Sequence, residues 1–338
     1  MANCNHALFA TALAGILAGT TPALAHHSAA AFDTQQNITV RGEIIEYSFK
    51  NPHVYMSLAV SNDDGSVTEM EVEAGAGSVI SPLGFTRDAV AVGDIVTISG
   101  NPGRRRPNAL MLGRELYKAD GSYYPLNISS RSIYESRDET ANSLEGTWFS
   151  ERQSFFAFLG SARTWKLTQR GSEAMANTDP LATPQKDCIP LAAPALMFYP
   201  VANTITVEED QIVLDVDWMD SRRVVYMDGR NHPDSSASFL HGHSIGTWDG
   251  EVLVIDTTNF AEHPMGLATN LPGGRGKHLT ERLKLNEDGK AITYSGVIVD
   301  DEYLAEPVQW SGEWVYRPNM EHSNEECDLA VARRFLAD

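Results

Sequence analysis

The chain has 338 residues, a formal net charge of −19 and three cysteines. So large an acidic excess repels phosphate backbones and anionic lipid headgroups, which argues against nucleic acid and membrane surfaces as partners. Beyond residues 1–25, no run reaches the roughly 18 apolar residues that a membrane-spanning helix requires, so we expect no membrane insertion.

Residues 1–25 have the pattern of an export signal peptide. A short apolar run over residues 7–18 precedes Ala23-Leu24-Ala25, which is the small-x-small pattern at which signal peptidase cuts. Cleavage there would make His26 the new amino terminus and would remove Cys4. We therefore expect a periplasmic or secreted protein.

Cys188 and Cys327 remain after such cleavage. Exported proteins fold in an oxidising compartment, so the simplest interpretation is one disulfide that closes a long loop. The alternative is two isolated buried thiols, which would need a less oxidising compartment.

Residues 26–117 are predicted to form a five-stranded OB-like barrel. Short runs rich in β-branched residues alternate with turn signals, and one helix is expected at residues 81–89. Three strands, a helix and two further strands follow each other in the order of an OB-type barrel. The basic residues 104–106 are interpreted as a solvated loop, with contact to an anionic ligand as the alternative. The expected strands are residues 38–47, 53–60, 67–73, 92–100 and 109–116.

Residues 118–145 are polar and interrupted by glycine and proline, and we interpret them as a linker. Residues 146–338 again show strand patterns without a convincing long amphipathic helix. About eight strands separated by turn residues predict a closed antiparallel β-barrel, so the whole protein is expected to be all-β. The glycine-rich residues 273–276 are interpreted as a loop over the barrel mouth. The expected strands are residues 165–169, 204–207, 211–217, 222–227, 251–256, 280–285, 291–299 and 308–316.

Gly146-Thr147-Trp148 opens the second domain, and the Gly-x-Trp pattern recurs at Gly246 and Gly312. The first of these resembles the Gly-x-Trp that begins the first strand of lipocalin-like barrels. The alternative is that each tryptophan simply caps a hydrophobic core. Further motifs in this domain resemble a group of uncharacterised exported bacterial proteins. They lie at residues 226–230, 243–246, 248–250 and 256–260.

Three motifs lie in the first third of the chain: His26-His27-Ser28, Asn51-Pro52-His53-Val54 and the strand pattern at residues 93–100. Together they resemble a family of exported bacterial domains of unknown function, the one numbered 6152. Neither this resemblance nor that of the second domain implies a chemical activity.

The first candidate site is a copper site at the mature amino terminus. His26 would offer its amine and a ring nitrogen, His53 or His27 a second ring, and Asp33 an axial oxygen. Such nitrogen-rich, roughly planar ligation suits Cu(II), and it resembles the histidine brace of exported copper proteins. This site would make the protein a non-catalytic carrier of copper or another ligand. The alternative is a frayed tail and a His53 that only hydrogen-bonds a loop.

The second candidate site lies inside the second barrel and centres on Glu281. The two-residue period of a strand places Glu281 on the same face as Leu279 and Leu283. A carboxylate that points into an apolar lumen is costly unless it is paired, and its pKa rises toward the range of a general acid or base. By the same rule Asp256 shares a face with Val254 and Val252.

We therefore predict a cofactor-independent site for a small, mostly apolar ligand in this barrel. One histidine and one buried acid suffice for proton transfer, so a lyase, isomerase or cyclase is the leading hypothesis. One alternative is a structural ion pair between Glu281 and Arg223, and another is a metal site at His241, His243 and Asp256. A purely structural, partner-binding protein is a third. The predicted catalytic residues are His243, Asp256 and Glu281, and the predicted ligand-binding residues are Arg223, Tyr226, His232, His241 and Trp248.

Overall fold

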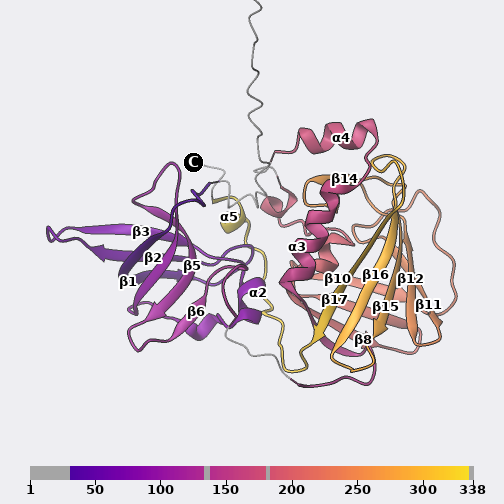
Figure 1. The fold of residues 1–338 in the computed structure, drawn as a ribbon, viewed down its shortest axis with the longest axis horizontal. Coiled ribbons are helices and arrows are strands. Elements are labelled where there is room, and N and C mark those ends of the chain that lie inside the picture. Colours follow the sequence, from indigo (N-terminus) through magenta and orange to yellow (C-terminus); the bar gives the residue numbers. More distant parts are fainter. Residues whose placement is uncertain (1–30, 133–137, 180–182, 335–338) are drawn as a thin grey trace, which may run out of the picture.

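The computed structural model describes residues 31–132, 138–179 and 183–334. These residues form two β-barrels that lie side by side, with the first third of the chain in one barrel and most of the remainder in the other (Figure 1). The all-β prediction is thus confirmed. Among the residues described, no helix is both long and apolar enough to cross a membrane.

The N-terminal barrel closes through five of the described strands, as predicted. The hydrogen-bonded order is β3-β2-β1-β4-β5, and a parallel pairing of β3 with β5 completes the ring. A short additional strand, β6 (Tyr123–Pro125), extends β5 from within the segment that we interpreted as a linker. The barrel strands are β1 (Ile38–Ser48), β2 (Tyr55–Ser61), β3 (Val67–Glu73), β4 (Ile95–Pro102) and β5 (Leu110–Lys118).

The single helix expected at residues 81–89 is wrong. The structure has a short helix α2 (Gly77–Ile80) followed by two 3₁₀ turns, η1 (Ser81–Leu83) and η2 (Arg87–Ala89). Gly84 ends the first turn with a φ of 114°, a left-handed conformation that stops helical hydrogen bonding. The strand expected from residue 53 begins two residues later, at Tyr55.

The C-terminal barrel closes through nine strands of the described chain. Neighbours run antiparallel except for β10 and β11, which pair in parallel over Val225–Ser244 and Tyr226–Ile245. The chain therefore leaves the wall after β10 and re-enters it at nearly the same place, with residues 227–242 as an external loop. The barrel strands are β7 (Gly146–Ser150), β8 (Ala202–Val207), β9 (Gln211–Val216), β10 (Ser221–Tyr226), β11 (His243–Asp249), β12 (Val252–Thr258), β15 (His278–Leu285), β16 (Ala291–Val299) and β17 (Val308–Tyr316).

The strand expected at residues 165–169 is wrong, because only Leu167 makes a bridge there and Gln169 already begins helix α4 (Gln169–Ala176). The Gly-x-Trp at residue 146 does open the first barrel strand, and Trp148 is fully buried. A second helix, α3 (Arg152–Ser161), packs beside β17, and a hairpin of β13 (His263–Ala268) and β14 (Leu271–Gly273) lies outside the barrel sheet.

Aromatic side chains fill the C-terminal barrel. Phe198, from the 3₁₀ turn η5 (Ala195–Phe198), packs 5.4 Å from the ring of Tyr294 and 5.3 Å from that of Trp310. Gly312 makes room for it, since a Cβ there would lie 2.4 Å from the Phe198 ring. Trp314, also fully buried, stacks on Tyr294. The lumen is therefore a packed core.

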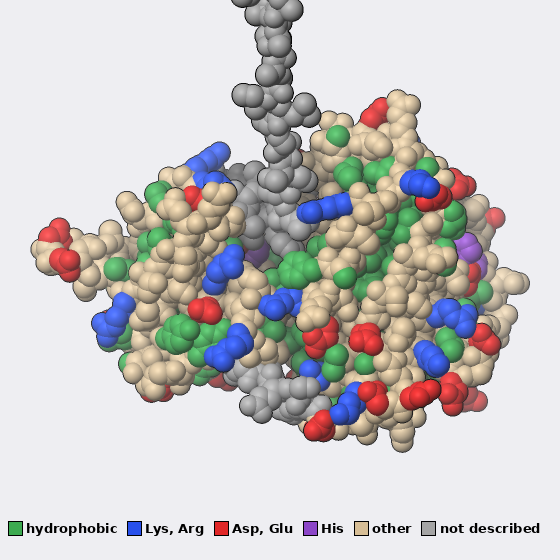
Figure 2. All heavy atoms as spheres, viewed as in Figure 1, with side chains coloured by type: hydrophobic (Ala, Val, Ile, Leu, Met, Phe, Trp, Pro, Cys, Tyr) green, Lys and Arg blue, Asp and Glu red, His purple; other side chains and the backbone are tan. Residues whose placement is uncertain are grey.

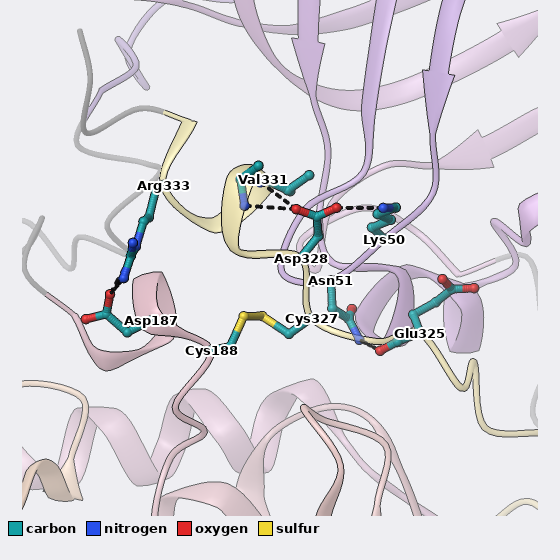
Figure 3. Close-up of a disulfide and its surroundings, with 10 residues drawn as sticks. Lys50, Asn51, Asp187, Cys188, Glu325, Cys327, Asp328, Val331 and Arg333 are labelled. Carbon is teal, nitrogen blue, oxygen red and sulfur yellow. Dashed lines mark hydrogen bonds and ion pairs between the residues drawn. A yellow bond between two sulfur atoms is a disulfide. The ribbon is translucent and has the colours of Figure 1, made fainter.

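A C-terminal segment ties the two barrels together (Figure 3). The predicted disulfide between Cys188 and Cys327 is present, which confirms that interpretation. Beside it, the Asn51 side chain donates to the Glu325 carbonyl at 2.8 Å, and Lys50 pairs with Asp328 at 2.6 Å. Helix α5 (Leu329–Ala332) follows Asp328 and contacts the 3₁₀ turn η4 (Pro184–Asp187), so this segment lies between the two barrels (Figure 1).

Candidate functional site

Glu281 faces the barrel interior, as predicted, where it forms an ion pair with Arg223. The guanidinium donates to both carboxylate oxygens, at 2.9 and 2.5 Å, and the two side chains are 1% and 0% exposed. Tyr294 and Thr257 also donate to the carboxylate. Burial opposes the charge of Arg223, but the adjacent carboxylate more than offsets this and raises the pKa of the guanidinium. The ion pair between Glu281 and Arg223, which we kept as an alternative, is therefore present.

Asp256 faces the opposite way from Glu281. On β12 the side chains of Leu253, Ile255 and Thr257 are buried, while Val254 and Asp256 are partly exposed. Asp256 does share a face with Val254, but it is the outer face, so the predicted place of Asp256 in the lumen is wrong. Both faces of this strand carry aliphatic side chains, and alternation alone cannot tell which of two apolar faces is inside.

His243 is also on the outer face, because its neighbour Ser244 occupies the inner one. There it belongs to a chain of polar groups at the rim where β12 ends and β11 and β15 begin. His232 Nε2 lies 2.9 Å from Asp256 Oδ1, and His278 Nε2 lies 2.6 Å from Asp256 Oδ2. On the far side of its ring, His232 Nδ1 lies 2.9 Å from His243 Nδ1. We call these four residues the outer histidine cluster.

With Asp256 ionised, its contacts fix two of the proton positions in the cluster. An ionised Asp256 can only accept, so each Nε2 facing it carries a proton. The contact between His232 Nδ1 and His243 Nδ1 needs one proton, which either ring can supply. Partial burial lowers the pKa of His243, and the neighbouring His232 lowers it further. The four side chains are therefore joined by a continuous chain of contacts from His243 to His278 along the outer wall.

A pocket of about 410 Å³ opens beside the cluster, and we call it the rim pocket. It is bounded by the external loop after β10, the end of β12 and the glycine-rich loop before β15, which sequence analysis placed over the barrel mouth. His232 and His278 both line it. The pocket also includes Pro233, Ser235, Ala237, Ser238, Asn259, Phe260, Arg275 and Lys277. In Figure 2 a histidine reaches the surface next to an acidic side chain at the edge of this barrel.

The structure brings together only part of the predicted site. Tyr226 joins the outer cluster, with its ring stacked 5.1 Å from that of His243. Trp248 lies further along β11 and is 49% exposed. The pKa of His241 is lowered to about 3, mainly by burial and then by the positive charge of Arg223. His278 is the residue that sequence analysis missed. Its signal was the pairing of β12 with β15, which no single-strand pattern reveals.

Lys277, next to His278, points inward. Its ammonium donates to the carbonyls of Ala193 and Gly266 at 2.7 Å each and lies 3.8 Å from the centre of the Phe260 ring. Burial lowers its pKa to about 7. The floor of the rim pocket thus has a buried amine behind an aromatic ring.

The predicted copper site is only partly within the described residues, because His26 and His27 lie outside them. His53 is there, with Nδ1 at 3.3 Å from both the Ala74 carbonyl and Glu73 Oε1, and burial lowers its pKa to about 4. Asp33 accepts hydrogen bonds from Gln35 and Gln36.

Metal ligation was also an alternative for His241, His243 and Asp256. Within residues 31–132, 138–179 and 183–334, no group of three or more His, Cys, Asp or Glu side chains is arranged to hold a metal ion. The cause at Asp256 is that His232 stands between it and His243 and uses both ring nitrogens to join them.

Comparison with known proteins adds one finding. Residues 13–110 match the model of a family of unknown function, DUF6152, in agreement with the motifs of the N-terminal part. No curated protein matches the chain. The C-terminal barrel, which holds the rim pocket, lies outside the matched segment.

Proposed function

We propose that this chain is an exported protein that binds a small molecule in the rim pocket and acts on it by acid–base chemistry. The observation that supports this most is Asp256, which lies between two imidazoles that both line one pocket. The proposal keeps the reaction class expected from the sequence, a cofactor-independent lyase, isomerase or cyclase, and moves it from the lumen to the outer wall.

His278 is the general base in this proposal. The His278 side chain is 45% exposed, and its Nε2 donates to Asp256. In the neutral imidazole this leaves the lone pair on His278 Nδ1. A carboxylate in this position orients the imidazole and stabilises the cation that forms when it takes a proton. The chain of contacts continues from Asp256 through His232 to His243, and these two histidines would return a proton to the product.

A neutral probe tests the base directly. In 5-nitrobenzisoxazole, removal of the C3 proton breaks the ring N–O bond and releases a coloured cyanophenolate, so turnover reports proton abstraction alone. We expect His278→Gln and Asp256→Asn to lower the rate at least about tenfold, the lower part of what acid–base groups contribute. Arg282→Gln is the control, since Arg282 is exposed on the same strand and pairs with Asp249. Wild-type rates in both site variants would refute the acid–base proposal.

The copper carrier remains a second proposal, supported by the surroundings of His53. Metal-binding histidines usually donate their other ring N–H to a carbonyl or carboxylate, and His53 Nδ1 faces one of each. Elemental analysis of protein secreted with its native amino terminus should find copper at unit stoichiometry. The metal should be lost in His26→Ala or His53→Ala and kept in His278→Gln. Metal-free secreted protein after exposure to copper would refute it.

A further inference from the structure

We infer that the ligand of the rim pocket carries a carboxylate, and that Arg275 is the residue that recognises it. The inference names a substrate class for the proposed acid–base site and rests on that proposal for the place where the ligand binds. It predicts a small organic acid with a hydrocarbon portion next to its charged group.

The charge of the pocket lining favours an anionic ligand. Among the described residues that line the pocket, Arg275 and Lys277 are basic, His232 and His278 are imidazoles, and none is acidic. The chain as a whole has 45 acidic and 26 basic residues, so an average surface patch would contain mostly acids. Asp256 lies behind the two imidazoles, where its oxygens are engaged. A basic pocket in an acidic protein concentrates anions locally.

The Arg275 guanidinium is exposed and makes a long ion pair with Glu262. The Arg275 side chain is 63% exposed, and its Nε is 3.8 Å from an oxygen of Glu262, which is itself 68% exposed. An ion pair this long and this wet contributes almost nothing to stability. A ligand carboxylate can replace it with two parallel hydrogen bonds at normal distance, which is the geometry that a guanidinium favours.

The rest of the pocket lining favours a ligand with an apolar part. Phe260, Pro233 and Ala237 provide an apolar surface, and Lys277 lies behind the Phe260 ring. In its protonated form that amine adds positive potential beneath the pocket. A volume of about 410 Å³ is in the range of sites for small molecules. A carboxylic acid with an aromatic or short aliphatic part would match both the basic and the apolar parts of the lining.

The test compares two ligands of one shape, phenylacetate and phenylacetamide, by calorimetry on the full-length mature protein. We expect phenylacetate to bind at least about tenfold more tightly, a preference of about 1.4 kcal/mol. Arg275→Gln should abolish the preference without weakening the amide, and Arg282→Gln, which removes the same charge outside the pocket, should preserve it. Circular dichroism checks that both variants are folded.

Three outcomes would overturn the inference: equal affinity for the two ligands, a preference that survives in Arg275→Gln, or no binding of phenylacetate at concentrations on the order of 10 mM. The neutral benzisoxazole separates this from a failure of the proposed function. Turnover of the neutral probe by the wild-type protein needs no recognition of a carboxylate, so it tests the acid–base function by itself. A carboxylate preference in a protein that does not turn over the neutral probe would support the binding inference and refute the acid–base function.

Discussion

Two carboxylates on neighbouring strands of the C-terminal barrel have opposite surroundings. Asp256 on β12 pairs in register with Thr280, the residue before Glu281 on β15. Glu281 faces the core and is neutralised by Arg223 without exposure to water, whereas the Asp256 side chain is 38% exposed and contacts two imidazoles. A buried carboxylate whose hydrogen-bond donors all come from strands of the barrel has a structural role. The carboxylate at the rim, joined to two imidazoles that line a pocket, is the one that we propose takes part in proton transfer.

The largest expected effect is on the inner pair. Glu281→Gln leaves the Arg223 charge buried without a counter-charge, and breaking such a pair typically costs about 3–5 kcal/mol. Urea unfolding followed by fluorescence should show this loss. The double variant Arg223→Met with Glu281→Leu, which removes both charges, should recover most of it. A loss below about 1 kcal/mol in the single variant would mean that the inner carboxylate is not structural.

The buried histidines should make stability depend on pH. Burial lowers the pKa of His263 to about 4, below the usual 6.5 of the unfolded chain. As pH falls below 6.5 the unfolded chain binds the proton first, so stability is full above that pH and is lost progressively on the way down to about 4. The loss at about pH 4.5 is roughly 2–3 kcal/mol for this group.

His263→Asn isolates this contribution. Asparagine can still accept the hydrogen bond that the Met265 N–H donates to His263 Nδ1 at 3.0 Å. The difference in unfolding free energy between wild type and variant should change by roughly 2–3 kcal/mol between pH 7 and about pH 4.5, in favour of the variant at low pH. A difference that is constant over this range would show that His263 titrates normally in the folded protein.

Thr257 tests the inner network without touching a charge. Its hydroxyl donates to Glu281 at 3.3 Å and lies 2.9 Å from the Ser244 hydroxyl. Thr257→Val keeps the shape and leaves those groups short of one partner, which should cost about 1–2 kcal/mol in urea unfolding. Thr293→Val, at a partly exposed position on β16, is the matched control and should cost less.

The smallest expected effect on stability is at the outer wall. Asp256→Asn removes a carboxylate that is partly exposed to solvent, so the free energy of unfolding should fall by no more than about 1 kcal/mol. The same substitution should cause the loss of turnover described above. If it destabilises the fold as strongly as Glu281→Gln, the division between a structural inner carboxylate and a functional outer one is wrong.

Local pattern was enough for many of the elements. Residues 67–73 show alternating apolar and polar side chains and are flanked by turn signals. Strand β3 begins and ends at the expected residues. The helix expected at residues 81–89 failed because Gly84 adopts a left-handed conformation, and a prediction that averages over a window does not register one such residue. The strand expected at residues 165–169 failed because a β pattern needs a partner strand, and only Leu167 finds one.

Sequence alone determined the all-β architecture, the two barrels, the pairing of Cys188 with Cys327 and the inward direction of Glu281. Each of these follows from the period of the side chains or from the number of cysteines. Only the tertiary structure decided that Asp256 faces outward and that His232, from a loop, and His278, from the next strand, meet it. Such contacts depend on register and on the path of a loop, and both are settled by packing between segments that are far apart in the chain.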